Sequence, residues 1–235
     1  MKISIVIPCY NEGENLAELM DAVHQVDPHG LDVEYILVNN GSRDDTGEQI
    51  DKYLSDNIKK VTVPENKGYG YGLQQGILAS TGYYVGWIHG DIQIHPTELN
   101  QFFRYIRDNE AGGYFLKGWR KNRSLFDKVF TWGQSFVNST MFHMKLRDIA
   151  AIPVIYPATV VRGAITEKMP NDFSIELFAY IEAMKLGLRE MRFNVHLADR
   201  KRGKSSWNTG FKSKIRQSKR IFQDSIKIKK GEKVL

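Results

Sequence analysis

The chain lacks cysteine almost entirely: of its 235 residues, only Cys9 is one. A single cysteine excludes an internal disulfide and favours a reducing compartment. Cys9 follows an apolar run, and neither histidine nor aspartate stands next to it to activate its thiol. We therefore interpret Cys9 as a small buried residue at the end of a strand and not as a nucleophile.

Long hydrophobic runs are also missing. The longest candidate, residues 150–161, is interrupted by Pro153 and Pro157, whereas a membrane span needs about 20 predominantly apolar residues. Residues 1–8 are too short for a secretory signal and are typical of a β-strand. We expect a cytoplasmic protein that reaches a membrane, if at all, as a peripheral protein at its inner face.

Acidic residues are scarce in the last part of the chain. Residues 200–235 hold 13 Lys/Arg and two acids, a net charge of +11, which leaves −5 for residues 1–199 out of the total of +6. Residues 211–228 have the pattern of a basic amphipathic helix. Its apolar stripe consists of Phe211, Ile215, Phe222 and Ile226. Either this stripe packs on the domain, or the helix lies on an anionic membrane surface; no recognised motif supports a nucleic-acid partner.

Apolar strand patterns alternate with helical patterns, which predicts an α/β fold with a mainly parallel sheet flanked by helices. Expected strands are residues 3–7, 33–38, 61–63, 83–88, 114–118 and 188–197. Expected helices are residues 15–26, 46–54, 69–78, 96–107, 125–144 and 173–186. A chain of this length fits one domain with an appended helix.

Each of the first four expected strands ends in a polar cluster. The clusters are residues 8–12, 39–42, 64–68 and 89–91. Ligands in open α/β sheets bind at the carboxyl ends of the strands. We therefore expect the four clusters to line one crevice.

The most informative cluster is His89-Gly90-Asp91-Ile92-Gln93. In extended backbone, alternate residues point to one face, so His89, Asp91 and Gln93 could converge. Their oxygen and nitrogen atoms suit a divalent cation that also binds phosphate oxygens. In the alternative interpretation, Asp91 merely caps the helix that follows.

Two further segments are ambiguous taken alone. Gly68-Tyr69-Gly70-Tyr71-Gly72 follows the third strand and has no acidic residue about 20 positions on, so it is no dinucleotide-binding motif. Its glycines more plausibly let the backbone approach a ligand or a neighbouring strand. The segment from Asn39 to Thr46 is either a turn with a helix cap or a pair of amides that bind a nucleobase edge.

The ordered set of motifs resembles a family 2 glycosyltransferase of the GT-A type over about residues 2–210. The motifs are Val6-Ile7-Pro8-Cys9-Tyr10-Asn11-Glu12, Asn40-Gly41-Ser42, Asn66-Lys67-Gly68 and Gly90-Asp91-Ile92-Gln93. Two later motifs are similar to the branch of dolichyl- and polyprenyl-phosphate mannosyltransferases. These are Asn171-Asp172-Phe173-Ser174-Ile175-Glu176-Leu177 and Asp199-Arg200-Lys201-Arg202-Gly203-Lys204-Ser205.

The resemblance implies a metal-dependent, inverting transfer of a sugar from a UDP- or GDP-sugar, with Mg²⁺ or Mn²⁺ as cofactor. The implied metal ligands are Asp91, Gln93 and His89. The implied nucleotide-sugar-binding residues are Pro8, Tyr10, Glu12, Asn40, Lys67, Gly68 and Asp91. The implied catalytic residues are Asp91, Asp172 and Arg200.

The acceptor implied by the resemblance is polyprenyl phosphate or a lipid-linked glycan in envelope or surface glycan biosynthesis. Arg200, Ser205 and Arg120 would hold its phosphate, whose oxygen is already an anion and needs no base. If the acceptor is instead a hydroxyl of a soluble or growing polysaccharide, Asp172 would act as general base. The implied domain spans residues 1–210, and residues 211–235 form the basic C-terminal helix. Within the domain, residues 1–95 bind the nucleotide-sugar and residues 96–210 form the acceptor half.

Three departures from the family pattern keep another class of function open. Asn39-Asn40 stands where the family usually has two aspartates, and His89 stands where the metal motif usually begins with aspartate. Residues 148–156 also lack the acceptor-side run common in the polyprenyl-phosphate branch. Since the first two changes remove negative charge from the donor site, a catalytically silent nucleotide-sugar-binding or membrane-scaffolding protein is the alternative to an enzyme.

Overall fold

In the computed structural model, the described residues form one seven-stranded sheet in the order β3-β2-β1-β4-β6-β5-β7. The structure describes residues 1–122, 124–164, 169–198 and 211–232, except for the side chains of residues 126 and 211–219. The strands are β1 (Lys2–Cys9), β2 (Asp32–Asn40), β3 (Ile58–Val63), β4 (Tyr84–Trp87), β5 (Tyr114–Lys121), β6 (Val154–Pro157) and β7 (Arg189–His196). Only β6 runs antiparallel to its neighbours. The predicted mainly parallel sheet is confirmed.

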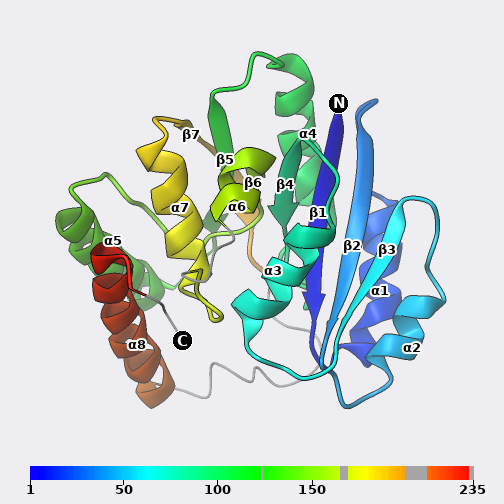
Figure 1. Ribbon diagram of the computed structural model, residues 1–235, viewed down its shortest axis with the longest axis horizontal. Helices are drawn as coiled ribbons and strands as arrows, with labels where there is room; N and C mark the ends of the chain where they lie inside the picture. Colours follow the sequence, from blue (N-terminus) through cyan, green and yellow to red (C-terminus); the bar gives the residue numbers. More distant parts are fainter. Residues whose placement is uncertain (123, 165–168, 199–210, 233–235) are drawn as a thin grey trace.

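Helices cover both faces of the sheet (Figure 1). They are α1 (Gly13–His24), α2 (Thr46–Asp51), α3 (Tyr69–Ala79), α4 (Leu99–Asp108), α5 (Leu125–Phe142), α6 (Ala158–Ala164), α7 (Ile175–Lys185) and α8 (Phe211–Lys230), with a short 3-10 helix at Pro96–Glu98 before α4. The chain steps outward from β1 to β2 and β3 and then returns past them to β4. Because parallel crossovers are right-handed, this reversal puts α3 on the face opposite α1 and α2.

The reversal also fixes where a ligand can bind. Strand order turns back between β1 and β4, which makes their carboxyl ends the topological switch point of the sheet. β1 lies at the centre, and Ile5, Val6 and Ile7 are fully buried, as expected for a strand covered on both faces. The core thus holds the carboxyl ends of these strands rigidly beside one another.

The sequence patterns missed β6 and α6. Pro153 and Pro157 interrupt the apolar run in this region, and proline cannot donate to a strand ladder. In the structure they flank or end a strand of only four residues, which pairs with β4 and β5. The carbonyl of Pro153 accepts a hydrogen bond of 2.8 Å from Gly118 N, so proline takes part as an acceptor.

The basic C-terminal helix is confirmed, but its packing face differs from the predicted stripe. Asp224, Ser225 and Ile228 are buried, whereas Phe222 and Ile226 are 45% and 37% exposed. The side chains of the other two predicted stripe residues lie outside the described part. α8 lies beside α5 (Figure 1). In the described part of the chain, no helix combines the length and apolar character that a membrane span requires.

Candidate functional site

The polar ends of β1 and β2 are joined directly. Asn11 N donates to Ser42 Oγ at 3.1 Å, and Glu12 N donates to Thr46 Oγ1 at 2.9 Å. The segment after β2 therefore holds the segment after β1 in place through side-chain oxygens. This supports the interpretation of residues 39–46 as a turn. Pro8 and Tyr10 are half-buried at this junction.

The ends of β3 and β4 join the same group. Asn40 Nδ2 donates to Gly68 O at 3.1 Å, which links the end of β2 to the segment after β3. Gly90 packs so closely on the end of β1 that a Cβ there would lie 3.3 Å from both Pro8 O and Cys9 Sγ. These contacts bring the four strand-end clusters together at one edge of the sheet, and that they line one crevice stays a prediction.

The glycines after β3 allow the backbone to approach other segments closely. A Cβ at Gly68 would lie 2.3 Å from Asn171 O, and one at Gly70 would lie 2.7 Å from Asp172 O. Tyr71 N donates to Asn171 O at 3.1 Å. Gly68 and Gly70 do let the backbone approach another segment closely, but the segment they meet is the loop that carries Asp172 and not a neighbouring strand.

Asn40 has an unusual environment for a polar side chain. It is 3% exposed, and its Oδ1 has no hydrogen-bond partner among the described residues. Gly72 leaves the space for its amide, since a Cβ there would lie 2.5 Å from Asn40 Cγ. A buried acceptor without a donor costs about 1–3 kcal/mol. A ligand N–H or O–H would remove that cost.

The segment after β4 does not have the extended backbone that the alternation argument assumed. A turn follows at residues 90–91, and Ile92 has a φ of 58°. Strand alternation therefore does not bring His89, Asp91 and Gln93 together, and their role as metal ligands stays a prediction. The alternative helix cap is also wrong: Asp91 Oδ1 accepts from Gln93 N at 3.2 Å, and His95 caps the following helix.

Asp91 is nevertheless half-buried at the switch point. Within the described ranges, no group of three or more His, Cys, Asp and Glu side chains is placed to hold a metal ion. A single carboxylate with neighbouring amide and imidazole groups fits a cation that takes its remaining ligands from a diphosphate and water, as Mg²⁺ commonly does. These side chains are thus compatible with a cation site that protein and diphosphate ligands share, and not with a site formed by protein ligands alone.

The buried carboxylate of Glu176 joins the end of β4 to the start of α3. Glu176 Oε1 accepts from Trp87 Nε1 at 2.7 Å and from Tyr69 OH at 3.0 Å. Burial raises the pKa of Tyr69 well above its usual value, and Glu176 and Asp91 raise it further. Tyr69 therefore stays protonated, and its ring holds His89 in an edge contact at 5.4 Å. Glu176 belongs to the sequence motif of residues 171–177, but only its hydrogen bonds show that it positions Tyr69 and Trp87.

Asp172 is bound to the C-terminal helix. Its Oδ2 lies 2.7 Å from Arg220 Nε, and its Oδ1 accepts from Ser174 N at 2.9 Å. Ser174 Oγ donates to Asp224 Oδ2 at 2.8 Å. Burial raises the pKa of Asp224, and the charge of Asp172 adds to this. Arg220 and Asp224 are residues that the sequence did not associate with the site.

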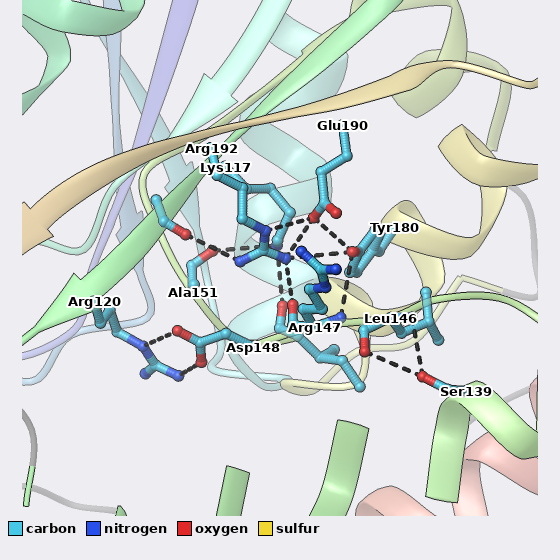
Figure 2. Close-up of polar contacts among 12 residues, drawn as sticks. Lys117, Arg120, Ser139, Leu146, Arg147, Asp148, Ala151, Tyr180, Glu190 and Arg192 are labelled. Atoms are coloured by element: carbon cyan, nitrogen blue, oxygen red, sulfur yellow. Dashed lines mark hydrogen bonds and ion pairs between the residues drawn. The ribbon is translucent and has the colours of Figure 1, made fainter. Parts of the chain in front are cut away.

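Four other predicted site residues are Arg120, Lys67, Arg200 and Ser205. Arg120 lies in a buried ion pair with Asp148, to which its Nε and Nη2 both donate (Figure 2). Lys67 is exposed, with its Nζ 5.3 Å from the ring centroid of Tyr71. Arg200 and Ser205 lie outside the described residues.

Two further predicted residues lie at the end of β1. Glu12 is 8% exposed. Burial raises the pKa of Cys9, and Glu12 and Asp44 raise it further, which agrees with its interpretation as an unreactive residue.

A family model described as Glycosyl transferase family 2 matches residues 4–162. The chain belongs to glycosyl transferase family 2. An uncharacterized glycosyltransferase of Synechocystis is 38% identical over 157 residues, which are 66% of this chain and 47% of the relative. A dolichol-phosphate mannosyltransferase of Pyrococcus furiosus is 28% identical over 154 residues, which are 63% of this chain and 43% of the relative.

The family 2 chain thus spans less than half the length of these two relatives. Its fold is similar to that of glucosyl-3-phosphoglycerate synthase from Mycobacterium tuberculosis, crystallised in complex with Mn²⁺, UDP and glucosyl-3-phosphoglycerate. The TM-score is 0.70 at 17% identity, and the match covers 98% of this chain and 80% of that one. The expected GT-A fold is confirmed.

Proposed function

We propose that this chain is a metal-dependent, inverting glycosyltransferase that uses a nucleotide-sugar. The observation that carries the proposal is the meeting of four polar strand ends beside the switch point, next to a buried Asn40 Oδ1 that no described residue bonds. The Mn²⁺ and UDP bound by the mycobacterial enzyme of similar fold support a nucleotide donor and a divalent cation.

The donor would lie across the ends of β1, β2 and β4. Asn40 would accept a hydrogen bond from the base or ribose, with Pro8, Tyr10 and Glu12 around it, and Lys67 and Gly68 would lie near the diphosphate. Asp91, with Gln93 and His89, would hold Mg²⁺ or Mn²⁺, whose charge stabilises the departing nucleoside diphosphate. The neutral Asn39 and Asn40 leave the base site less acidic than an aspartate pair would.

For the acceptor, a lipid-linked phosphate is the better candidate. Both oxygens of Asp172 already have partners in Ser174 and Arg220, which favours a positioning role over proton abstraction. A phosphate oxygen needs no base, and Arg200 and Ser205 would bind it, with Arg120 contributing through the N–H groups that Asp148 does not bind. The similarity to a dolichol-phosphate mannosyltransferase supports this choice. Membrane contact through residues 211–235 and a role in envelope or surface glycan assembly remain part of the proposal.

The donor proposal is tested by a thermal-shift titration with UDP- and GDP-sugars, with and without Mn²⁺. Ligands that bind the native state raise the melting temperature by mass action. We expect a Mn²⁺-dependent rise that Asp91→Ala abolishes and that Asp108→Ala, an exposed aspartate on α4, leaves intact. A rise that persists in Asp91→Ala would contradict the metal assignment.

The acceptor and the alternatives are separated by transfer assays. With a polyprenyl phosphate acceptor, Asp172→Asn should lower the rate modestly, because the amide can still bond to Ser174 N. If only polysaccharide hydroxyls are glycosylated and Asp172→Asn is inactive, the second enzyme reading is correct. Donor binding without turnover on either acceptor class would favour the silent binding protein.

A further inference from the structure

α5 presents an unusually apolar outer face. Leu125, Val129, Trp132 and Phe136 recur at helical spacing and are 78%, 61%, 68% and 59% exposed. We call these four residues the α5 stripe. The rings of Trp132 and Phe136 stack with centroids 5.6 Å apart. A contiguous exposed apolar surface of this kind marks an interaction site more often than chance exposure does.

A hollow of about 680 Å³ opens beside the α5 stripe, between α5, the end of β5 and the segment before β6. Trp119, Trp132, Phe136 and Leu146 supply most of its apolar wall. Ser135, which is 8% exposed, also lines it, and its Oγ has no hydrogen-bond partner among the described residues. The hollow is large enough for part of an alkyl or prenyl chain.

The charge around the hollow is positive. Lys128, Lys145 and Arg147 line it, and none of them forms an ion pair with a described residue. The one acid in the lining, Asp148, is paired with Arg120 (Figure 2). The surface therefore combines apolar side chains with an excess of cations.

Apolar side chains together with an excess of cations favour one kind of binding partner over the others. A second copy related by a two-fold axis would bring the same cations against each other, which is unfavourable. An anionic bilayer offers phosphate groups to the cations and hydrocarbon to the stripe, and each cation near such a surface strengthens binding by about fivefold. Tryptophan is also a preferred residue at the boundary between headgroups and hydrocarbon.

We propose that the α5 stripe and the adjoining hollow dock on an anionic lipid bilayer, with one lipid chain entering the hollow. The proposal deepens the proposed function, since it rests on a lipid-linked acceptor, and it moves the apolar part of the membrane contact from α8 to α5. α8 packs beside α5 through a hydrogen bond of 2.8 Å from Ser225 Oγ to Asn138 Oδ1. It thereby connects the docking surface to the Arg220–Asp172 pair.

Vesicle co-sedimentation tests the proposal, with vesicles of phosphatidylcholine alone and mixed with phosphatidylglycerol. Wild type should bind the mixed vesicles more tightly. Trp132→Glu and Val129→Glu should each weaken that binding about tenfold or more, since a charge at the interface opposes insertion. Lys145→Glu should weaken binding to the mixed vesicles only. Leu78→Glu, at a residue 59% exposed on α3, is the matched control and should bind as wild type does.

The nucleotide-sugar thermal shift of each variant is measured in parallel. If vesicle binding follows the expected pattern while wild type binds no nucleotide-sugar, the docking surface stands and the proposed function fails. The docking proposal is overturned if wild type does not bind mixed vesicles, or if Phe222→Glu abolishes binding and Trp132→Glu does not. It is equally overturned if sedimentation equilibrium shows a dimer that Trp132→Glu dissociates while vesicle binding persists.

Discussion

Replacing Gly72 by alanine separates the ligand role of Asn40 from its role in stability. A Cβ at this position would lie 2.5 Å from Asn40 Cγ and 2.6 Å from Oδ1. Carbon atoms in contact are about 3.5 Å apart, so the amide must move by roughly 1 Å. The hydrogen bond of 3.1 Å from Asn40 Nδ2 to Gly68 O would then be lost or badly lengthened.

The effects on stability nearly cancel. Loss of that hydrogen bond costs about 1 kcal/mol, and alanine in place of glycine within α3 contributes about 1 kcal/mol in the other direction. We expect the free energy of unfolding to change by no more than about 1 kcal/mol. A displaced amide, in contrast, removes a hydrogen bond to the nucleotide worth about 1–3 kcal/mol, which corresponds to roughly 5- to 150-fold weaker binding.

Isothermal titration with UDP and GDP, together with urea unfolding, measures both quantities. Gly133→Ala has open space around its Cβ and should stabilise α5 by about 0.5–1 kcal/mol without affecting nucleotide affinity. Gly76→Ala places a Cβ 2.3 Å from Val6 Cγ1, so it should cost about 1–3 kcal/mol of stability with affinity unchanged. If Gly72→Ala binds the nucleotide as tightly as wild type does, or if Gly76→Ala loses as much nucleotide affinity as Gly72→Ala, Asn40 does not bind the nucleotide.

Three further predictions concern charged groups. Burial would raise the pKa of Glu34, but hydrogen bonds from Lys59 and neighbouring groups lower it from 4.5 to about 2. The contribution of Glu34 to the free energy of unfolding is therefore complete above pH 4.5 and is lost toward pH 2. Because Lys59 is 41% exposed, we expect this contribution to be about 1–2 kcal/mol. Urea unfolding at several pH values measures it, and Glu34→Gln should lack it. Burial lowers the pKa of Lys117 from 10.5 to about 8, so its contribution to stability should grow as pH rises from about 8 to 10, and Lys117→Met should flatten that slope. Arg220→Ala should lower the transfer rate modestly, by no more than about tenfold, because it misplaces Asp172, and it should leave UDP affinity unchanged; a weaker UDP affinity would contradict its place on the acceptor side.

The sequence predicted the parallel sheet and the meeting of its polar ends because both follow from local patterns and a general topological rule. Each apolar run was followed by a polar cluster, and parallel strands deliver such clusters to one edge. It did not predict the backbone after β4, where the positive φ of Ile92 breaks the alternation. A branched residue in that region is rare, so no pattern signals it.

The packing face of α8 shows a second limit of sequence patterns. Hydrophobic spacing favoured a face that includes Phe222 and Ile226, yet the polar residues Asp224 and Ser225 are buried beside Ile228. They are buried because Ser174 donates to Asp224 and Ser225 donates to Asn138. A polar residue paired with a distant polar residue does not register in a pattern that scores hydrophobicity along one helix.

The same pairing bears on how the acceptor half works. Asp172 contacts both sides of the site: its backbone carbonyl lies against Gly70 at the start of α3, and its carboxylate pairs with Arg220 on α8, which lies beside α5. A movement of α8 would act first on the side chain of Asp172, since Arg220 holds one of its two oxygens and Ser174, itself bonded to Asp224, holds the other through its backbone N–H. If α5 and α8 meet the membrane together, docking and the orientation of Asp172 are therefore linked through three short contacts. Arg220→Lys keeps the charge but not the planar geometry of the guanidinium, so it should retain vesicle binding and still lose part of the transfer rate.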